Sequence, residues 1–123
     1  MSQPDFYTDY SEEVLVELDR LQEVALGQVE LQRELLETLI EVVRVNIEAI
    51  QNALPASDYL TVSKCSHQIK GAAANVGVPS IRGLAAELER QAKAQNLLGA
   101  AELLAALENQ RSRVQAFISS QLS

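Results

Sequence analysis

Apolar residues recur at spacings of three and four along most of the chain, which is the period of an amphipathic helix. The apolar stripes are separated by residues that end or start helices, with Pro55 closing one stripe and Pro79 placed to open another. The pattern predicts four helices, over about residues 29–54, from Ser57 or the residue before it to about residue 76, from Pro79 onward, and over about residues 98–118.

A shorter helix is expected before these four. Ser11 is a good N-cap, and the carboxylates that follow it suit the positive end of a helix. This helix is expected to end near Gly27, and residues 1–10 are expected to form a flexible lead-in. Its apolar stripe comprises Val14, Leu15, Leu18, Leu21 and Ala25.

The connections between the predicted helices are short, so neighbouring helices must run antiparallel and close their apolar stripes on one axis. The composition agrees, with 47% hydrophobic but 4% aromatic residues, and 123 residues suit a single core. We therefore expect an all-α fold, an antiparallel four-helix bundle with an additional N-terminal helix, as one domain over residues 11–120.

The formal net charge of -7 argues against nucleic acid or an anionic membrane as the main partner. One cysteine and one histidine give no disulfide and no zinc spacing, so we expect no metal site. The start of the chain does not resemble a signal peptide, and we expect a monomer in the cytoplasm. Residues 59–101 nevertheless carry five basic and two acidic side chains, which fits either chance variation or a mildly basic docking surface.

His67 is the residue that the helical pattern singles out. On a helical wheel of about 100° per residue, the apolar residues of the third helix fall opposite it, so its imidazole should face solvent. Gly71, one turn further on, costs about 1 kcal/mol relative to alanine in a helix, which suggests that space is needed there. The residues on the opposite side are Val62, Cys65, Ile69, Ala72, Ala73 and Val76, and those on the side of His67 are Ser63, Lys64, Lys70, Gly71 and Ala74.

An exposed imidazole with nearby cations and open access is suited to phosphoryl transfer. Imidazole has an ordinary pKa of about 6.5, so it is a competent nucleophile near neutral pH. Lysines three residues away can offset the charge of a transferred phosphoryl group. From the residues alone, an ordinary surface patch and a phosphoryl-transfer site remain equally open.

The stretch from His67 to Gly77 resembles the signature of the histidine phosphotransfer (HPt) domain family. It reads as a histidine, two residues, Lys-Gly, small residues and a glycine that closes the helix. Leu88-Glu89 resembles the Leu-Glu that often follows in this family, and the resemblance covers most of residues 11–118. The chain departs from the family at Ala85, where a cysteine is common, and in its second helix, which has aliphatic residues where a phenylalanine is often found.

The resemblance implies that His67 is the phosphoacceptor, that Lys70 supports the phosphate and that Gly71 gives access to the partner. HPt domains carry phosphoryl groups between aspartates of receiver domains, so the expected partners are response-regulator receiver domains and a hybrid histidine kinase. They are phosphocarriers without a nucleotide site, and no cofactor is expected because Mg²⁺ comes from the receiver. Residues expected to contact the partner are Ser63, Lys64, Gln68 and Ala74.

Three alternatives stay open at this point. The chain could be the phosphoacceptor domain of a chemotaxis-type kinase, which shares the motif. It could be a helical adaptor that docks receivers and transfers nothing, in which case changing His67 would leave signalling intact. It could also be a structural bundle that binds no receiver.

Overall fold

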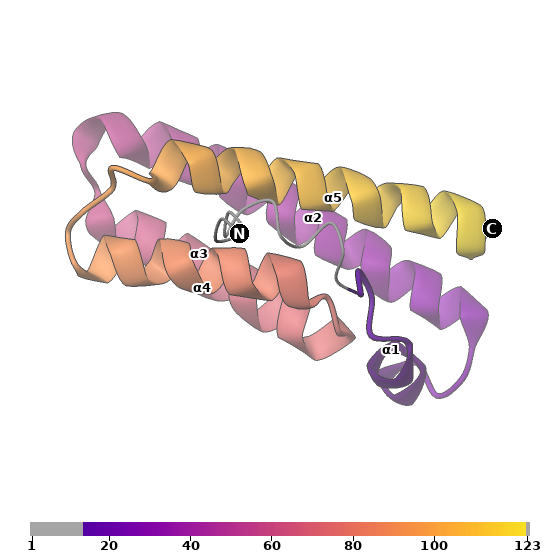
Figure 1. Cartoon of the computed structure of the whole chain (residues 1–123). Coiled ribbons are helices and arrows are strands. Elements are labelled where there is room, and N and C mark those ends of the chain that lie inside the picture. The colour runs from indigo at the N-terminus through magenta and orange to yellow at the C-terminus, as the bar shows by residue number, and fades with distance from the viewer. Residues whose placement is uncertain (1–13, 123) are drawn as a thin grey trace, which may run out of the picture.

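The computed structural model describes residues 14–122, which form helices joined by short connections, with no strand among them. The predicted lead-in, residues 1–10, and the predicted cap Ser11 lie outside this range. Four long helices form an antiparallel bundle, and a short N-terminal helix lies at one end of it (Figure 1), so the predicted fold class is confirmed. The elements are α1 (Leu18–Val24), α2 (Val29–Ala53), the 3-10 turn η2 (Leu54–Ala56), α3 (Tyr59–Val76), α4 (Pro79–Lys93) and α5 (Ala100–Gln121).

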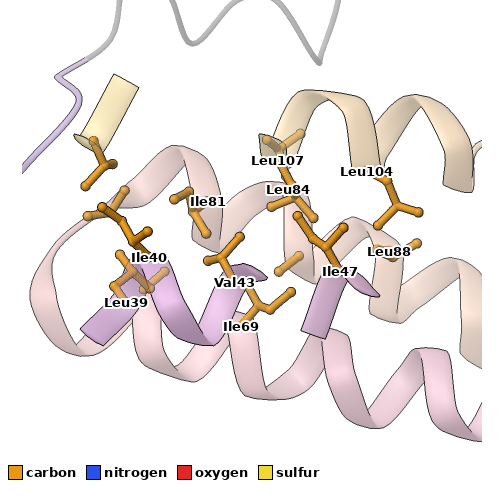
Figure 2. Close-up of a cluster of buried hydrophobic side chains, with 14 of the residues drawn as sticks. Leu39, Ile40, Val43, Ile47, Ile69, Ile81, Leu84, Leu88, Leu104 and Leu107 are labelled. Carbon is orange, nitrogen blue, oxygen red and sulfur yellow. The ribbon is translucent and has the colours of Figure 1, made fainter. Parts of the chain in front are cut away.

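One apolar core runs between the four long helices. Ile69 of α3, Leu84 of α4 and Leu107 of α5 are fully buried and meet the aliphatic face of α2. Because each such side chain contributes about 1.5–3 kcal/mol when removed from water, packing rather than helix propensity holds the bundle together. Figure 2 shows this core, with Leu39, Ile40, Val43, Ile47, Ile69, Ile81, Leu84, Leu88, Leu104 and Leu107 labelled.

The first helix begins later than predicted. Residues 14–17 are not helical, and α1 starts at Leu18. The backbone N–H of Glu17, a residue in an extended conformation, donates a hydrogen bond to the carbonyl of Gly77 (2.7 Å), which holds this segment against the end of α3. As a result Val16 is buried, whereas Val14 and Leu18 of the predicted stripe are exposed.

The start of α3 also differs from the prediction by one residue. Asp58, rather than Ser57 or the residue before it, is the N-cap, and its carboxylate accepts hydrogen bonds from the backbone N–H (3.1 Å) and the hydroxyl (2.6 Å) of Thr61. Ser57 instead takes the left-handed conformation, with φ at 51°, because it turns the chain after η2.

The connection between α3 and α4 consists of Gly77 and Val78. Gly77 is left-handed, with φ at 79°, and the N–H groups of both residues donate to the carbonyl of Ala73 at 3.0 Å. This cap ends α3 and satisfies one of its free carbonyls, and Pro79 then opens α4. The short turn makes α3 and α4 antiparallel neighbours and fixes which of their residues face each other.

Within residues 14–122, no helix combines the length and the apolar character that crossing a membrane requires.

Candidate functional site

His67 lies in the middle of α3 and faces solvent. Its side chain is 67% exposed. On the opposite face of the helix, four of the six residues predicted to be buried are buried and two, Cys65 and Ala72, are half-buried. Burial, and then the nearby charge of Asp58, raise the pKa of the Cys65 thiol, so this side chain stays protonated and acts as a small apolar residue.

Glu89 of α4 is the group that organises the site. Its side chain is 7% exposed, and its carboxylate has three partners. Oε2 lies 3.0 Å from Nδ1 of His67 and 3.2 Å from Nζ of Lys93. Oε1 accepts a hydrogen bond from Nζ of Lys70 at 2.6 Å. The site is therefore built from two neighbouring helices, with the histidine on α3 and the carboxylate on α4.

Glu89 is ionised in this arrangement. Burial alone would raise the pKa of its carboxyl group, but hydrogen bonds and charges from Lys70 and Lys93 outweigh that effect and hold the pKa below its ordinary value. A carboxylate has no proton to donate, so the 3.0 Å contact requires that Nδ1 of His67 carries the hydrogen and donates it. Nε2 is then the ring nitrogen with the free lone pair.

A hollow of about 420 Å³ lies beside the imidazole. Three of the four residues predicted to contact the partner line it together with His67, and α4 contributes the remainder of the wall. The lining residues are Ser63, Lys64, His67, Gln68, Glu89 and Lys93.

Gly71 leaves open space on the same side of α3. A Cβ placed there would meet no atom within 4 Å among residues 14–122, apart from its chain neighbours and the backbone of its own helix. Ala74, the fourth predicted partner contact, is exposed further along the helix and does not line the hollow. The surface beyond His67 is therefore low and accessible to a large partner.

A second hollow, of about 530 Å³, lies between α2 and α3. It is mostly apolar, and its wall includes Val45, which is 48% exposed. Gln68 lines this hollow as well as the one beside His67, so the two lie next to each other on α3. Its full lining is Thr38, Glu41, Val42, Val45, Asn46, Gln68 and Ala72.

Sequence reasoning gave no role to Glu89 or Lys93. The family resemblance includes Glu89 only through the Leu88-Glu89 pair, although this residue falls on the buried stripe of α4 between Ala85 and Ala92. An acidic residue in an otherwise apolar stripe was the signal that could have revealed it, since buried carboxylates are almost always paired. Ser66, next to His67, was also missed: it is fully buried and its hydroxyl donates to the carbonyl of Val62 at 2.7 Å.

The basic character of residues 59–101 is partly neutralised in the structure. Lys70 and Lys93 pair with Glu89, and Arg90 pairs with Glu87. Two of the five basic side chains of this segment are thus held at the carboxylate that contacts His67. Within the part of the chain that the structure describes, no group of three or more His, Cys, Asp or Glu side chains could hold a metal ion.

Comparison with known proteins places this chain in a family. The family model described as "Hpt domain" matches residues 34–117, which include α3, α4 and most of α2 and α5. Among curated protein sequences, none matches significantly.

Two solved structures are similar to the chain. Histidine-containing phosphotransfer protein B of Pseudomonas aeruginosa PAO1 superimposes with a TM-score of 0.80 at 21% identity, over 89% of this chain and 96% of that one. The HPT domain of the Hpt sensor hybrid histidine kinase from Shewanella superimposes with a TM-score of 0.71 at 27% identity, over 97% of this chain and 100% of that one. Since the family model covers more than half of the sequence, the chain belongs to the Hpt domain family, whose members are histidine-containing phosphocarriers of phosphorelays.

Proposed function

We propose that this protein carries a phosphoryl group on Nε2 of His67, accepting it from the aspartate of one receiver domain and passing it to another. The observation that carries the assignment is the 3.0 Å contact between Nδ1 and Glu89. It fixes the hydrogen on Nδ1 and leaves Nε2 as the nucleophile, on a side chain that is 67% exposed.

The transfer step follows from this geometry. The lone pair of Nε2 attacks phosphorus in line, the P–O bond to the receiver aspartate breaks, and its electron pair leaves with the aspartate carboxylate. The neutral imidazole becomes a phosphoimidazolium that still carries its hydrogen on Nδ1. The Glu89 carboxylate stabilises that new positive charge, as the orienting acid does in other histidine-dependent sites.

Lys70 and Gly71 serve the same step in different ways. Lys70 is held 2.6 Å from Glu89, so its charge stays at the carboxylate that contacts the imidazole and offsets the negative charge of the incoming phosphoryl group. Gly71 leaves room for the receiver to approach the ring. The phosphoryl donor is an aspartyl phosphate, so the carrier needs no nucleotide site, and Mg²⁺ arrives with the receiver.

The receiver is proposed to dock on the solvent face of α3. Ser63, Lys64 and Gln68 surround the imidazole, and Ala74 extends the face beyond Gly71. The mostly apolar hollow between α2 and α3 lies next to this face, on the other side of Gln68, and offers an apolar part of the docking surface. The proposal includes a hybrid histidine kinase as one source of the receiver, a monomeric carrier and a cytoplasmic location.

The test is to incubate the protein with a phosphorylated receiver and to measure acid-labile phosphate on the carrier. We expect label on the wild type and none on His67→Gln, with helicity by circular dichroism unchanged because His67 is outside the core. The exposed Asn75→Gln, two turns further along α3, is the control for altering this helix and should be labelled normally.

The other outcomes separate the rival functions. Equal labelling of His67→Gln would show that the phosphoacceptor lies elsewhere. Receiver binding without any label would identify an adaptor. Labelling by a kinase domain and ATP, but by no receiver, would identify a chemotaxis-type phosphoacceptor domain.

A further inference from the structure

The two oxygens of Glu89 are used unequally. Oε1 accepts from Lys70, whereas Oε2 is shared by Nδ1 of His67 at 3.0 Å and Nζ of Lys93 at 3.2 Å. Because both contacts meet at one oxygen, the Lys93 ammonium can be no further from Nδ1 than the sum of these distances. The Lys93 ammonium, from α4, is thus held near the imidazole through the oxygen atom that both of them contact.

The two lysines differ in how firmly they are held. Lys70 makes the shorter contact, 2.6 Å, and its side chain is 34% exposed. Lys93 makes the longer contact, 3.2 Å, and its side chain is 67% exposed. The Lys93 end of its pair reaches solvent, and Lys70 and His67 stay on the carboxylate, so Lys93 can leave Glu89 while Lys70 remains as the counter-charge.

Lys93 also lines the hollow beside His67. A phosphoryl group on Nε2 would bring a charge of about -1.5 to -2 and three acceptor oxygens to the rim of this hollow. Glu89 would at the same moment gain a third positive partner beside Lys70 and Lys93, because the ring becomes an imidazolium. Both changes favour movement of the Lys93 ammonium from the carboxylate to the phosphoryl group.

We infer that Lys93 is a second phosphoryl-binding residue, which leaves Glu89 when His67 is phosphorylated and donates a charge-assisted hydrogen bond to a phosphoryl oxygen. This inference rests on the proposed function. It gives the phosphoryl group a second cation, from α4, in addition to Lys70 from α3. No covalent bond changes in this movement: the ion pair between Lys93 and Glu89 breaks, and one between Lys93 and the phosphoryl group forms.

The test uses phosphoramidate, so that it does not depend on finding a receiver. Phosphoramidate transfers its phosphoryl group to a histidine nitrogen: the P–N bond to the amide nitrogen breaks, a P–Nε2 bond forms and ammonia leaves. The pKa of the phosphoryl group on His67 is then read from the pH dependence of its ³¹P chemical shift. A neighbouring ammonium lowers this pKa because it stabilises the dianion.

We expect Lys93→Gln to raise the pKa of the phosphoryl group by about 0.5, as suits a contact at a partly exposed site. Lys93→Arg, which keeps the charge and can donate hydrogen bonds, should restore the wild-type value. Arg82→Gln is the control for losing an exposed cation from α4, because Arg82 lies seven residues before Glu89, and it should leave the pKa unchanged. Circular dichroism of each variant verifies that the bundle is intact.

Two results would overturn the inference. One is an unchanged phosphoryl pKa in Lys93→Gln. The other is a larger change in Lys64→Gln, which would make Lys64, on the other side of the hollow, the cation that binds the phosphoryl group. If wild-type His67 accepts no phosphoryl group from either phosphoramidate or a receiver, the proposed function fails together with the inference.

Discussion

Two glycines six residues apart on α3 and its cap have opposite surroundings. A Cβ at Gly77 would lie 3.0 Å from Cβ of Arg20 and 3.1 Å from the carbonyl oxygen of Glu17, and the residue has φ at 79°. Gly71 has ordinary helical geometry, and its surroundings are open. The end of α3 at Gly77 is therefore packed against other residues of the protein, while the face of α3 at Gly71 has no neighbour among the described residues.

The contrast separates a position where glycine serves folding, Gly77, from one where it leaves room for a partner, Gly71. At Gly77 glycine is required by the backbone conformation and by the close approach of the segment before α1. At Gly71 nothing within the described structure requires glycine, although it weakens the helix. Substitutions near Gly77 should affect stability, and substitutions near Gly71 and His67 should affect transfer.

The largest expected effect on stability is that of Gly77→Ala. We expect a loss of about 3 kcal/mol, because a left-handed alanine is strained and the new methyl group presses on the backbone of Glu17. Urea unfolding followed by circular dichroism measures it.

Gly27→Ala is the matched control, since Gly27 is also left-handed, with φ at 73°, but its Cβ would meet nothing within 4 Å in the described residues. It should lose only the stability that corresponds to the strain of a left-handed alanine, about 1 kcal/mol. Equal losses in the two variants would contradict a close approach at Gly77.

Gly71→Ala should act in the opposite direction. We expect the isolated protein to gain about 1 kcal/mol of stability, from the better helix propensity of alanine. Transfer from a phosphorylated receiver should fall by about tenfold, because the methyl group holds the partner away from the ring. Unfolding curves and rapid-quench transfer rates give the two values.

Ala116→Gly, at an exposed position in α5, measures the effect of helix propensity in this bundle. It should lower the free energy of unfolding by as much as Gly71→Ala raises it, and it should not alter transfer. A stability gain at Gly71 with transfer unaffected would remove the case for a partner at this face.

The smallest expected effect on stability is that of Glu89→Gln, with a loss below about 1 kcal/mol at pH 7, because the amide oxygen can still accept a hydrogen bond and both lysine side chains can reach solvent. The pKa of Glu89 is held below its ordinary value of 4.5 in the folded protein, as the lysine hydrogen bonds outweigh burial. Its stabilisation is therefore present above pH 4.5 and is lost as the pH falls through the lowered pKa.

Urea unfolding at pH 7 and at pH 3 should accordingly show the gap between wild type and Glu89→Gln closing in acid. The exposed Glu37→Gln on α2 controls for the loss of a negative charge. A gap that widens in acid would mean that the carboxylate is not stabilised by its lysines. Transfer should fall in Glu89→Gln at pH 7, since the imidazolium loses its counter-charge.

The sequence predicts those features that depend on a single helix, namely which face is exposed and where the helix begins and ends. The apolar period of α3 predicts that His67 faces solvent, and the helix-ending signals predict its boundaries to within a residue or two. The late start of α1 could not be predicted, because the bond from Glu17 to Gly77 joins residues sixty positions apart.

The partner of the histidine was missed for the same reason. Glu89 is 22 residues from His67, and no period within α3 or α4 reports which residues of the two helices face each other. The predicted position of Lys70, beside the ring, was approximate: its ammonium contacts the carboxylate that holds the ring.

The two-residue connection between α3 and α4 makes chain length at that turn a determinant of chemistry. Inserting one residue near the start of α4 would rotate all later positions by about 100° relative to those before it. Either the apolar stripe of α4 or the Glu89 carboxylate would then turn away from α3. Because the stripe buries more apolar surface, it would stay in the core and the carboxylate would move away from His67. Such an insertion would leave a folded bundle whose histidine is still exposed but has no oriented tautomer. Insertions and deletions at this turn should therefore be selected against because they disrupt the site, in addition to any loss of packing around the buried Val78.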